Sequence, residues 1–428
     1  MICLDAEVRQ CAERFRSAFS KPQEESFVTV LLGLLECEGR RTLSGIMSKV
    51  AQPPSLSGWS RFFAESPWMA QALVTIWLER IRNEMEPLVE AEREQQRQVQ
   101  PKRRGRPQDP LVTGYLIGDA STMRKPKGRK MAGLGKHHST THEQRIIGQS
   151  LVAGLDVLLD RRCPLAPQLD RQEKVCESEE VVFESTIALM ETFIRPFEPV
   201  VGTKTHVLLD SCSGAKGLWR AARDRDFPIT AGLKSNRWLR VVDDSTPQGW
   251  RWQQLSASLA SLSEQDFVQV CWPRGGKAVS VPVVNTSVRK RYGCPVVIVR
   301  HSLSAPRSQA RYWASSDREA DTPTLLAHIS ARWDSEVLFA DGKEELGLDH
   351  DQLMSAQALV RFWTLAMLVS TFLEQEQHRL QLRWQRPVTL GEARREIQRR
   401  HRHCLLDWLH RQFLSGVHLD TLVDLLAA

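Results

Sequence analysis

The stretch Arg332-Trp-Asp-Ser-Glu336-Val-Leu-Phe-Ala-Asp-Gly-Lys343 carries the most informative pattern in the sequence. Positions 329, 332, 336, 340 and 343 step by three or four residues, which is the spacing of side chains along one face of an α-helix. An arginine, a carboxylate and a lysine are thus presented in a row on a predicted helix. Asp119 and Asp210 each follow a short apolar run that is typical of a buried strand, so three carboxylates could share one site.

Length and composition indicate a globular protein with more than one domain. The chain has 428 residues, of which 42% are hydrophobic and 25% charged, as in ordinary folded domains. Its first residues lack the basic start and apolar core of a secretory signal, and the apolar run from Phe362 to Leu373 is too short to cross a bilayer. Nine scattered cysteines without a Cys-x-x-Cys pair favour a reducing compartment. We therefore expect a soluble, unexported protein with no membrane partner.

Positive charge is concentrated in two segments, although the formal net charge is only +7. Eleven lysines and arginines against two acids lie between Arg97 and Lys136, and nine arginines against three acids lie between Arg379 and Arg411. Such clustering is typical of a protein that binds a polyanion, although a charge run is more often a solvated surface. Within the first segment, Arg104-Gly-Arg106-Pro resembles an AT-hook, whose arginines enter a narrow minor groove. A flexible basic tether is the alternative.

The residue patterns divide the chain into six regions. We expect a helical DNA-binding domain over 1–95, a basic AT-hook-like linker over 96–112, an α/β core in two parts over 113–240 and 319–372, a β-rich insertion over 241–318, and a C-terminal helical region over 373–428. Within the first region, Thr42–Ala51 and Ser55–Phe63 could form a helix-turn-helix DNA reader. A plain helical bundle fits the same residues equally well.

Local patterns predict several boundaries of helices and strands. One helix is expected from about Ser178 to Phe193, and another is expected to begin with Thr322 as its cap and proline at its first position. The sequence Thr389-Leu-Gly-Glu392 is a capping box, which predicts the start of a further helix. Short alternating strands are predicted between Trp238 and Trp313.

Three carboxylates that share a site are suited to phosphoryl transfer on a nucleic acid. One divalent cation can activate the attacking hydroxyl while a second stabilises the departing oxygen. Mg²⁺ takes a few carboxylates and keeps its other positions for water and phosphate, so Mg²⁺, which Mn²⁺ could replace, is the expected cofactor. Taken one at a time, Asp119 could be a turn residue, Asp210 a helix cap, and Glu336 a partner of Arg332 on the same helix. The acids nearest to Glu336 are expected on solvated faces: Asp334, Asp341, Glu344 and Glu345.

With these motifs, the chain resembles the DDE transposases of bacterial insertion sequences. In one group of this family the catalytic glutamate lies in a signature of tyrosine, two residues, arginine, three residues, glutamate, six residues and lysine. Arg332, Glu336 and Lys343 match the signature, and the β-rich block between Asp210 and Glu336 matches an insertion that this group carries. The interval between Asp119 and Asp210 is also typical of the group. The tyrosine position departs from the pattern, because Ile329 occupies it.

The resemblance implies both a fold and a set of site residues. The fold would be an RNase H-like α/β core interrupted by the β-rich insertion. Asp119, Asp210 and Glu336 would be the catalytic and metal-binding residues, and Arg332 and Lys343 would contact DNA phosphates. Some relatives stack a flipped base on a tryptophan in the strand before the signature helix, and the nearest candidate for this DNA contact is Trp313.

The activity implied by the resemblance is DNA transposition. Such a protein binds the terminal inverted repeats of its element, cuts at the ends and joins the 3′-hydroxyl to target DNA, in the cytoplasm and on the nucleoid. Bringing two ends together implies a homodimer. Two alternatives remain open from the sequence: a domesticated DNA-binding protein that keeps the fold without the chemistry, and a metal-dependent DNA nuclease that does not join strands.

Overall fold

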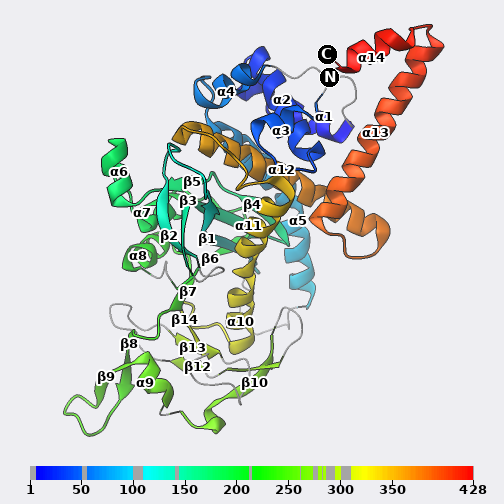
Figure 1. Cartoon of the computed structure of the whole chain (residues 1–428). Coiled ribbons are helices and arrows are strands. Elements are labelled where there is room, and N and C mark those ends of the chain that lie inside the picture. Colours follow the sequence, from blue (N-terminus) through cyan, green and yellow to red (C-terminus); the bar gives the residue numbers. More distant parts are fainter. Residues whose placement is uncertain are drawn as a thin grey trace.

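A mixed β-sheet lies at the centre of the computed structural model, with helices at both ends of the chain (Figure 1). Ten strands form this sheet, in the order β12-β13-β14-β7-β6-β1-β3-β2, with β4 and β5 paired to β3. The protein is therefore of the α/β class that its sequence predicts. The structure describes residues 6–50, 55–99, 109–139, 144–211, 215–260, 262–272, 278–281, 283–285, 295–299 and 310–427.

The middle of the sheet is built from two long strands and two shorter parallel ones. The strands β1 and β3 form an antiparallel pair, while β6 runs parallel to β1 and β7 runs parallel to β6. Helices connect the strands that run parallel, as such crossovers require. The bounds are β1 Val112–Arg124, β2 Gly135–Ser139, β3 Gln144–Leu158, β4 Arg161–Pro164, β5 Gln168–Asp170, α6 Glu173–Glu179, α7 Thr186–Ile194, β6 Thr203–Leu209, α8 Lys216–Asp224 and β7 Ile229–Leu233.

Both faces of β1 and β6 are buried, because alternate side chains on a strand point to opposite sides of the sheet. Leu116, Val207 and Leu209 pack in one hydrophobic cluster with residues of α7 and α8. On the other face, Ile117 and Leu208 pack with Leu338 of α11, which spans Trp333–Leu346. The face that carries odd-numbered residues of β1 and even-numbered residues of β6 is thus the one that α11 covers.

Short strands are present between Trp238 and Trp313, as predicted, and part of this segment extends the central sheet. The strand β14 pairs with β7, β13 with β14 and β12 with β13, all antiparallel. The remaining strands form two separate hairpin-like pairs, β8 with β9 and β10 with β11. The bounds are β8 Trp238–Val242, β9 Trp250–Gln254, α9 Leu255–Ala260, β10 Val268–Cys271, β11 Ala278–Val281, β12 Val283–Asn285, β13 Pro295–Val299 and β14 Arg311–Ser315.

The helices at the two ends of the chain share one hydrophobic core. The N-terminal helices are α1 Ala6–Glu13, α2 Lys21–Glu36, α3 Leu43–Met47, α4 Leu56–Ala64 and α5 Ala70–Val99, and the C-terminal ones are α10 Thr322–Ala331, α11, α12 Ala356–Trp384, α13 Leu390–Leu414 and α14 Leu419–Ala427. One cluster of buried residues joins Trp59 of α4, Trp77 of α5, Met123 of β1 and Trp363 of α12. The helix α5 continues past the predicted boundary at residue 95, and α12 continues past the one at 372.

The helix α12 runs through the middle of this shared core. By length and composition it could cross a membrane, but 83% of its most apolar stretch is buried inside the protein. Arg361 on α12 donates hydrogen bonds to the backbone carbonyls of Phe63 and Ser66, at 2.8 and 2.6 Å. These contacts attach the N-terminal helices to α12, and the burial is that of a core helix in a soluble protein.

Two predicted helix boundaries were wrong. The single helix expected from Ser178 to Phe193 is two helices, because α6 ends at Glu179 and the Ser185 side chain accepts a hydrogen bond that starts α7. The cap of α10 is Asp321, one residue before the expected Thr322, and its carboxylate accepts from the backbone of the third residue beyond it. The predicted capping box that opens α13 is confirmed.

Candidate functional site

Asp119 lies on β1, and Asp210 directly follows the end of the neighbouring parallel strand β6. In the register of β1 and β6, Gly118 stands beside Leu209. Asp119 follows Gly118 and Asp210 follows Leu209, and the two strands run in the same direction. Neighbouring strands are about 4.8 Å apart and residues in register share a face, so both carboxylates lie on the face that α11 covers. Asp119 does not end its strand as predicted, since β1 continues to Arg124; it lies where the neighbouring strand β6 ends.

The Asp119 side chain is 14% exposed, and its carboxylate is held by several donors. One oxygen, Oδ1, accepts a hydrogen bond of 2.8 Å from the backbone N–H of Ala120, and the other, Oδ2, accepts one of 2.6 Å from the Ser335 hydroxyl. Burial raises the pKa of Asp119, and the charge of Asp210 adds to the increase, whereas Ser335 and Arg332 oppose it. The contribution of Asp210 indicates that the two carboxylates lie near enough to interact.

Glu336 joins these aspartates through Arg332. The guanidinium of Arg332 donates to Oε1 of Glu336 from Nη2, while its Nη1 lies 3.6 Å from Oδ2 of Asp119. Arg332 stands at the junction between α10 and α11 and keeps helical backbone angles, φ −54° and ψ −28°. The side chains of Asp119 and Arg332 are each 14% exposed, and that of Glu336 is 39% exposed. A single arginine thus bridges the strand acid and the helix acid, with Asp210 beside them.

Lys343 reaches the same end of the sheet from two turns further along α11. Its Nζ donates to the Ser121 hydroxyl at 2.9 Å and to the Thr122 carbonyl at 3.4 Å. Both partners follow Asp119 on β1, which places a second cation close to the acids. Burial lowers the pKa of the Lys343 amine, and the charge of Asp349 opposes this.

Trp313 and Ile329 border the site from the side of the insertion. The Arg332 guanidinium carbon lies 5.8 Å from the centre of the Trp313 ring, within range of a cation–π contact. Trp313 is on β14, between Gly232 of β7 and Val297 of β13. Ile329 is 5% exposed and packs in a cluster with Val297 and other apolar residues of β13 and α10. An aliphatic residue therefore suits the position where the family pattern has tyrosine.

Some acids near Glu336 are not on solvated faces, contrary to the prediction. Asp334 is only 9% exposed. Burial raises the pKa of Asp341, and Glu345 forms an ion pair of 3.1 Å with Arg394 of α13. Glu344 is exposed as expected. The helix α11 packs between the sheet and the C-terminal helices, so most of its circumference is covered.

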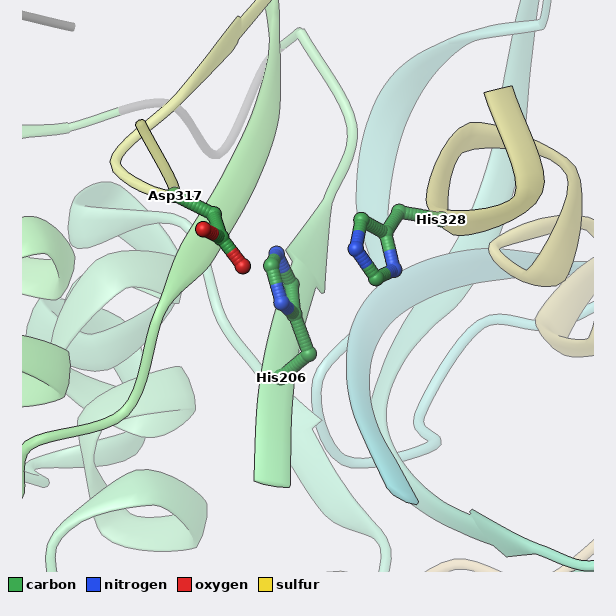
Figure 2. A group of neighbouring side chains, drawn as sticks. All are labelled: His206, Asp317 and His328. Atoms are coloured by element: carbon green, nitrogen blue, oxygen red, sulfur yellow. The ribbon is translucent and has the colours of Figure 1, made fainter. Parts of the chain in front are cut away.

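A second polar cluster, which the sequence did not predict, lies on the same face of the sheet. It consists of His206 on β6, Asp317 just after β14 and His328 on α10 (Figure 2). Each residue offers a ligand atom within 4.8 Å of those of the other two. More than one hundred residues separate the two histidines, so no local spacing reveals them. One signal was present in the sequence. His206 and Asp210 are four residues apart, so on a strand their side chains would share a face, and His328 precedes Arg332 by one helical turn.

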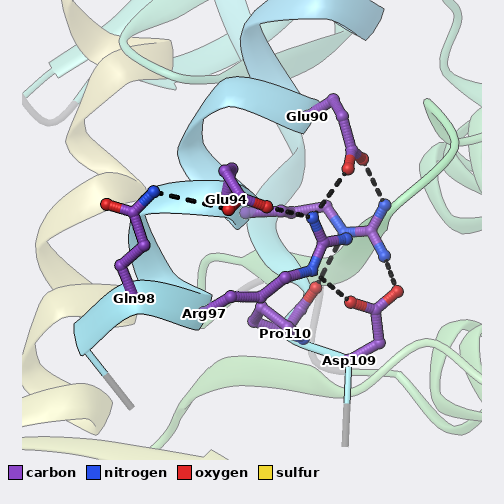
Figure 3. Close-up of polar contacts among 7 residues, drawn as sticks. Glu90, Glu94, Arg97, Gln98, Asp109 and Pro110 are labelled. Carbon is purple, nitrogen blue, oxygen red and sulfur yellow. Dashed lines mark hydrogen bonds and ion pairs between the residues drawn. The ribbon is translucent and has the colours of Figure 1, made fainter.

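The AT-hook-like residues Arg104 and Arg106 lie outside the described part of the chain. The two described segments that flank them are held together by ion pairs (Figure 3). Arg97 donates to one oxygen of Asp109 at 2.9 Å, and Arg93 donates to the other. Arg93 also donates to the carbonyl of the next residue, Pro110, at 2.9 Å. The end of α5 is thereby attached to the start of β1.

The three acids have the donor set that Mg²⁺ prefers, because all offer carboxylate oxygens and Glu336 is open to solvent. Asp119, Asp210 and Glu336 are the residues that could hold such an ion, with Arg332 and Lys343 as neighbouring cations. Comparison of the chain with protein-family models and with curated proteins gave no match.

Proposed function

We propose that the protein is a Mg²⁺-dependent DNA transposase of the DDE type. The observation that carries this proposal is the arrangement of Asp119, Asp210 and Glu336 around Arg332. Two of these acids come from adjacent strands and the third from a helix more than one hundred residues later. A protein that only binds DNA gains nothing from carboxylates that repel phosphate at such a site.

The strand order supports an RNase H-like core. The first strand of the core, β1, lies in the middle of the sheet, with the antiparallel strand β3 on one side and the parallel strands β6 and β7 on the other. An RNase H-like core has a central first strand of this kind, with acids on it and on the next parallel strand. The β-rich insertion enters between β7 and α10, as the family resemblance implies.

In the proposed reaction the protein holds and orients two divalent cations. Mg²⁺, or Mn²⁺ in its place, would supply charge stabilisation at the attacking and departing oxygens. Asp119, Asp210 and Glu336 would be its ligands. Ser335 orients the Asp119 carboxylate through its hydrogen bond. Arg332 neutralises the acids in the structure described here, and it would turn to a DNA phosphate when a cation takes over that role.

The substrate in this proposal is double-stranded DNA at the element ends and at the target. Lys343 would contact phosphate beside the cut, and the tethered basic linker with Arg104 and Arg106 would lie in the minor groove nearby. Trp313, already against Arg332, would stack on a base near the cut end. The working complex would be a homodimer that acts in the cytoplasm on the nucleoid.

The test is Glu336→Gln, with Glu344→Gln as the matched control on the same helix. Duplexes made from the genomic DNA that flanks the gene are incubated with the full chain and Mg²⁺ or EDTA. We expect Glu336→Gln to lower cleavage by at least about 10²-fold, the scale of losing one group that stabilises a transition state. Its stability should change by only about 0.3–0.5 kcal/mol, because its ion pair with Arg332 joins residues one helical turn apart and the Glu336 side chain is 39% exposed.

The control variant should cleave as the natural protein does, because Glu344 is exposed and lies about two turns beyond Glu336 on α11. Joining of a cut end to a second duplex would distinguish a transposase from a nuclease. If Glu336→Gln still cuts at the natural rate, Glu336 is not a catalytic residue and the proposal fails.

A further inference from the structure

We propose that His206, Asp317 and His328 form a binding site for a transition-metal ion of the Zn²⁺ type, separate from the three acids. Imidazole nitrogen and carboxylate oxygen are ligands that Zn²⁺ takes readily and that Mg²⁺ does not require together. The three residues come from β6, from the end of β14 and from α10. An ion bound by all three would link α10 directly to the sheet. The proposal does not depend on the transposase chemistry.

The first observation in its favour is an unsatisfied buried side chain. His328 is 3% exposed, and neither of its ring nitrogens has a hydrogen-bond partner among the described residues. A neutral imidazole has one donor and one acceptor nitrogen, and leaving such groups buried and unpaired destabilises a fold. A metal bond to one nitrogen would remove one of these two deficits.

The second observation concerns the tautomer of His206. The Thr230 hydroxyl donates to the Ser315 hydroxyl at 2.9 Å, so its oxygen must accept the hydrogen bond of 2.9 Å that joins it to Nε2 of His206. The proton of His206 is therefore on Nε2, and Nδ1 carries the free lone pair. Metal-binding histidines are commonly oriented by such a partner on the opposite nitrogen.

The charged groups around the cluster suit a cation beside Asp317. The charged groups that face the cluster are Asp317 and Lys204, whose Nζ lies 3.3 Å from the Asp317 carboxylate. The Lys204 side chain is 46% exposed and can move into water at small cost. A divalent cation can then take its place beside Asp317.

Binding requires one local movement. The rings of His206 and His328 are stacked with centres 3.9 Å apart at 18°, and Figure 2 shows the Asp317 carboxylate directed toward His206. Lone pairs in two parallel planes cannot reach one ion, so one ring must turn. His328 is the ring that can turn without breaking a hydrogen bond. Ligands of a tetrahedral zinc ion lie about 3.3 Å apart, given bonds of about 2.0 Å. The present spacing of at most 4.8 Å is within reach of that rotation.

The experiment measures metal content and stability in the full-length protein. The protein is treated with a chelator, reloaded with Zn²⁺ and freed of unbound ion by dialysis. We expect one zinc ion per chain, a higher Tm with zinc than with EDTA, and visible absorption bands of a tetrahedral site when Co²⁺ replaces zinc. His328→Gln and Asp317→Asn should each lower zinc affinity by more than about 10–100-fold. That range is the typical loss when a residue that only hydrogen-bonds to a metal ligand is replaced, and the loss of a ligand itself should be larger.

Two controls separate this site from other metal binding. His138→Gln alters an exposed histidine on β2 and should retain zinc. Asp119→Asn should also retain zinc, since it alters the acids of the proposed transposase site instead. Asp317 lies at the edge of the cluster with 12% of its side chain exposed, so its variant should fold even if the His328 variant does not. Failure of the natural protein to retain zinc, or undiminished zinc in folded Asp317→Asn, would overturn the proposal.

Discussion

Replacing Arg332 by glutamine removes the cation that lies between Asp119 and Glu336. The contact with Glu336 joins residues one turn apart, and because Glu336 is 39% exposed it should contribute only about 0.3–0.5 kcal/mol. The contact with Asp119 is of a different kind, because both side chains are 14% exposed and the closest atoms are 3.6 Å apart. Coulombic attraction at about 4 Å is on the order of 4 kcal/mol for an effective dielectric constant of 20. Desolvation of the pair cancels part of this.

The expected loss in the unfolding free energy is about 1–3 kcal/mol near pH 8 without metal, the cost of leaving a buried charged group unpaired. Arg332 lowers the pKa of Asp119, so the substitution raises that pKa beyond the increase that burial already causes. A carboxyl whose folded-state pKa is raised destabilises the fold only when it is ionised. The loss should therefore disappear below about pH 4, near the unfolded-state pKa of aspartate, and grow as the pH rises through the folded-state pKa.

Urea unfolding of the two proteins across this pH range, in EDTA, measures the effect. Arg332→Lys keeps the charge and should recover part of the lost stability, and Mg²⁺ should stabilise Arg332→Gln more than the natural protein because the variant has no competing cation. A variant that is as stable as the natural protein near pH 8, or a loss that stays constant down to about pH 4, would refute the assigned role of Arg332.

Three further predictions concern two side chains beside the acids and one buried ion pair just after β1. Ser335→Ala removes the hydrogen bond of 2.6 Å to Asp119, so the free energy of unfolding should fall by about 1 kcal/mol. Because this hydrogen bond lowers the pKa of Asp119, the acidic limb of the cleavage pH profile should move to higher pH. An unmoved limb would argue against orientation of Asp119 by Ser335. Lys343→Met should weaken DNA binding for all sequences and reduce the slope of log affinity against log salt concentration by about one. Band-shift assays at several salt concentrations measure this slope. An unchanged slope would count against a phosphate contact by Lys343. Lys125→Met leaves Asp351 without its partner at 2.7 Å, in a pair 6% and 1% exposed; urea unfolding should show a loss of roughly 3–5 kcal/mol, and a loss below 1 kcal/mol would contradict it.

Local patterns in the sequence were sufficient where neighbouring residues decide the structure. The capping box at Thr389 and the short strands of the insertion were predicted because caps and alternation depend on residues a few positions apart. The start of α7 at Ser185 was missed, since the apolar residues before it resemble a helix but lie exposed in a loop. An intrinsic preference for helix does not decide such a segment when its side chains gain no burial.

The candidate site was predictable only in part. Its three acids and the arginine follow a recognisable spacing, but the position of Asp119 inside its strand depends on pairing with β3, which continues to Arg124. The cluster of His206 and His328 depends on how α10 packs on β6, a contact between residues far apart in the chain. Neither the strand pairing nor this packing can be derived from local spacing alone, because both are set by tertiary contacts.

The core that α4 and α5 share with α12 limits how the N-terminal helices can change in evolution. A segment with its own core can be exchanged between proteins by recombination, since both partners fold without it. Here such an exchange would expose Trp363 and its apolar neighbours and destabilise the sheet scaffold as well. The exposed surface of α4 and α5 can therefore change by substitution, while the buried side of these helices must stay matched to the rest of the chain.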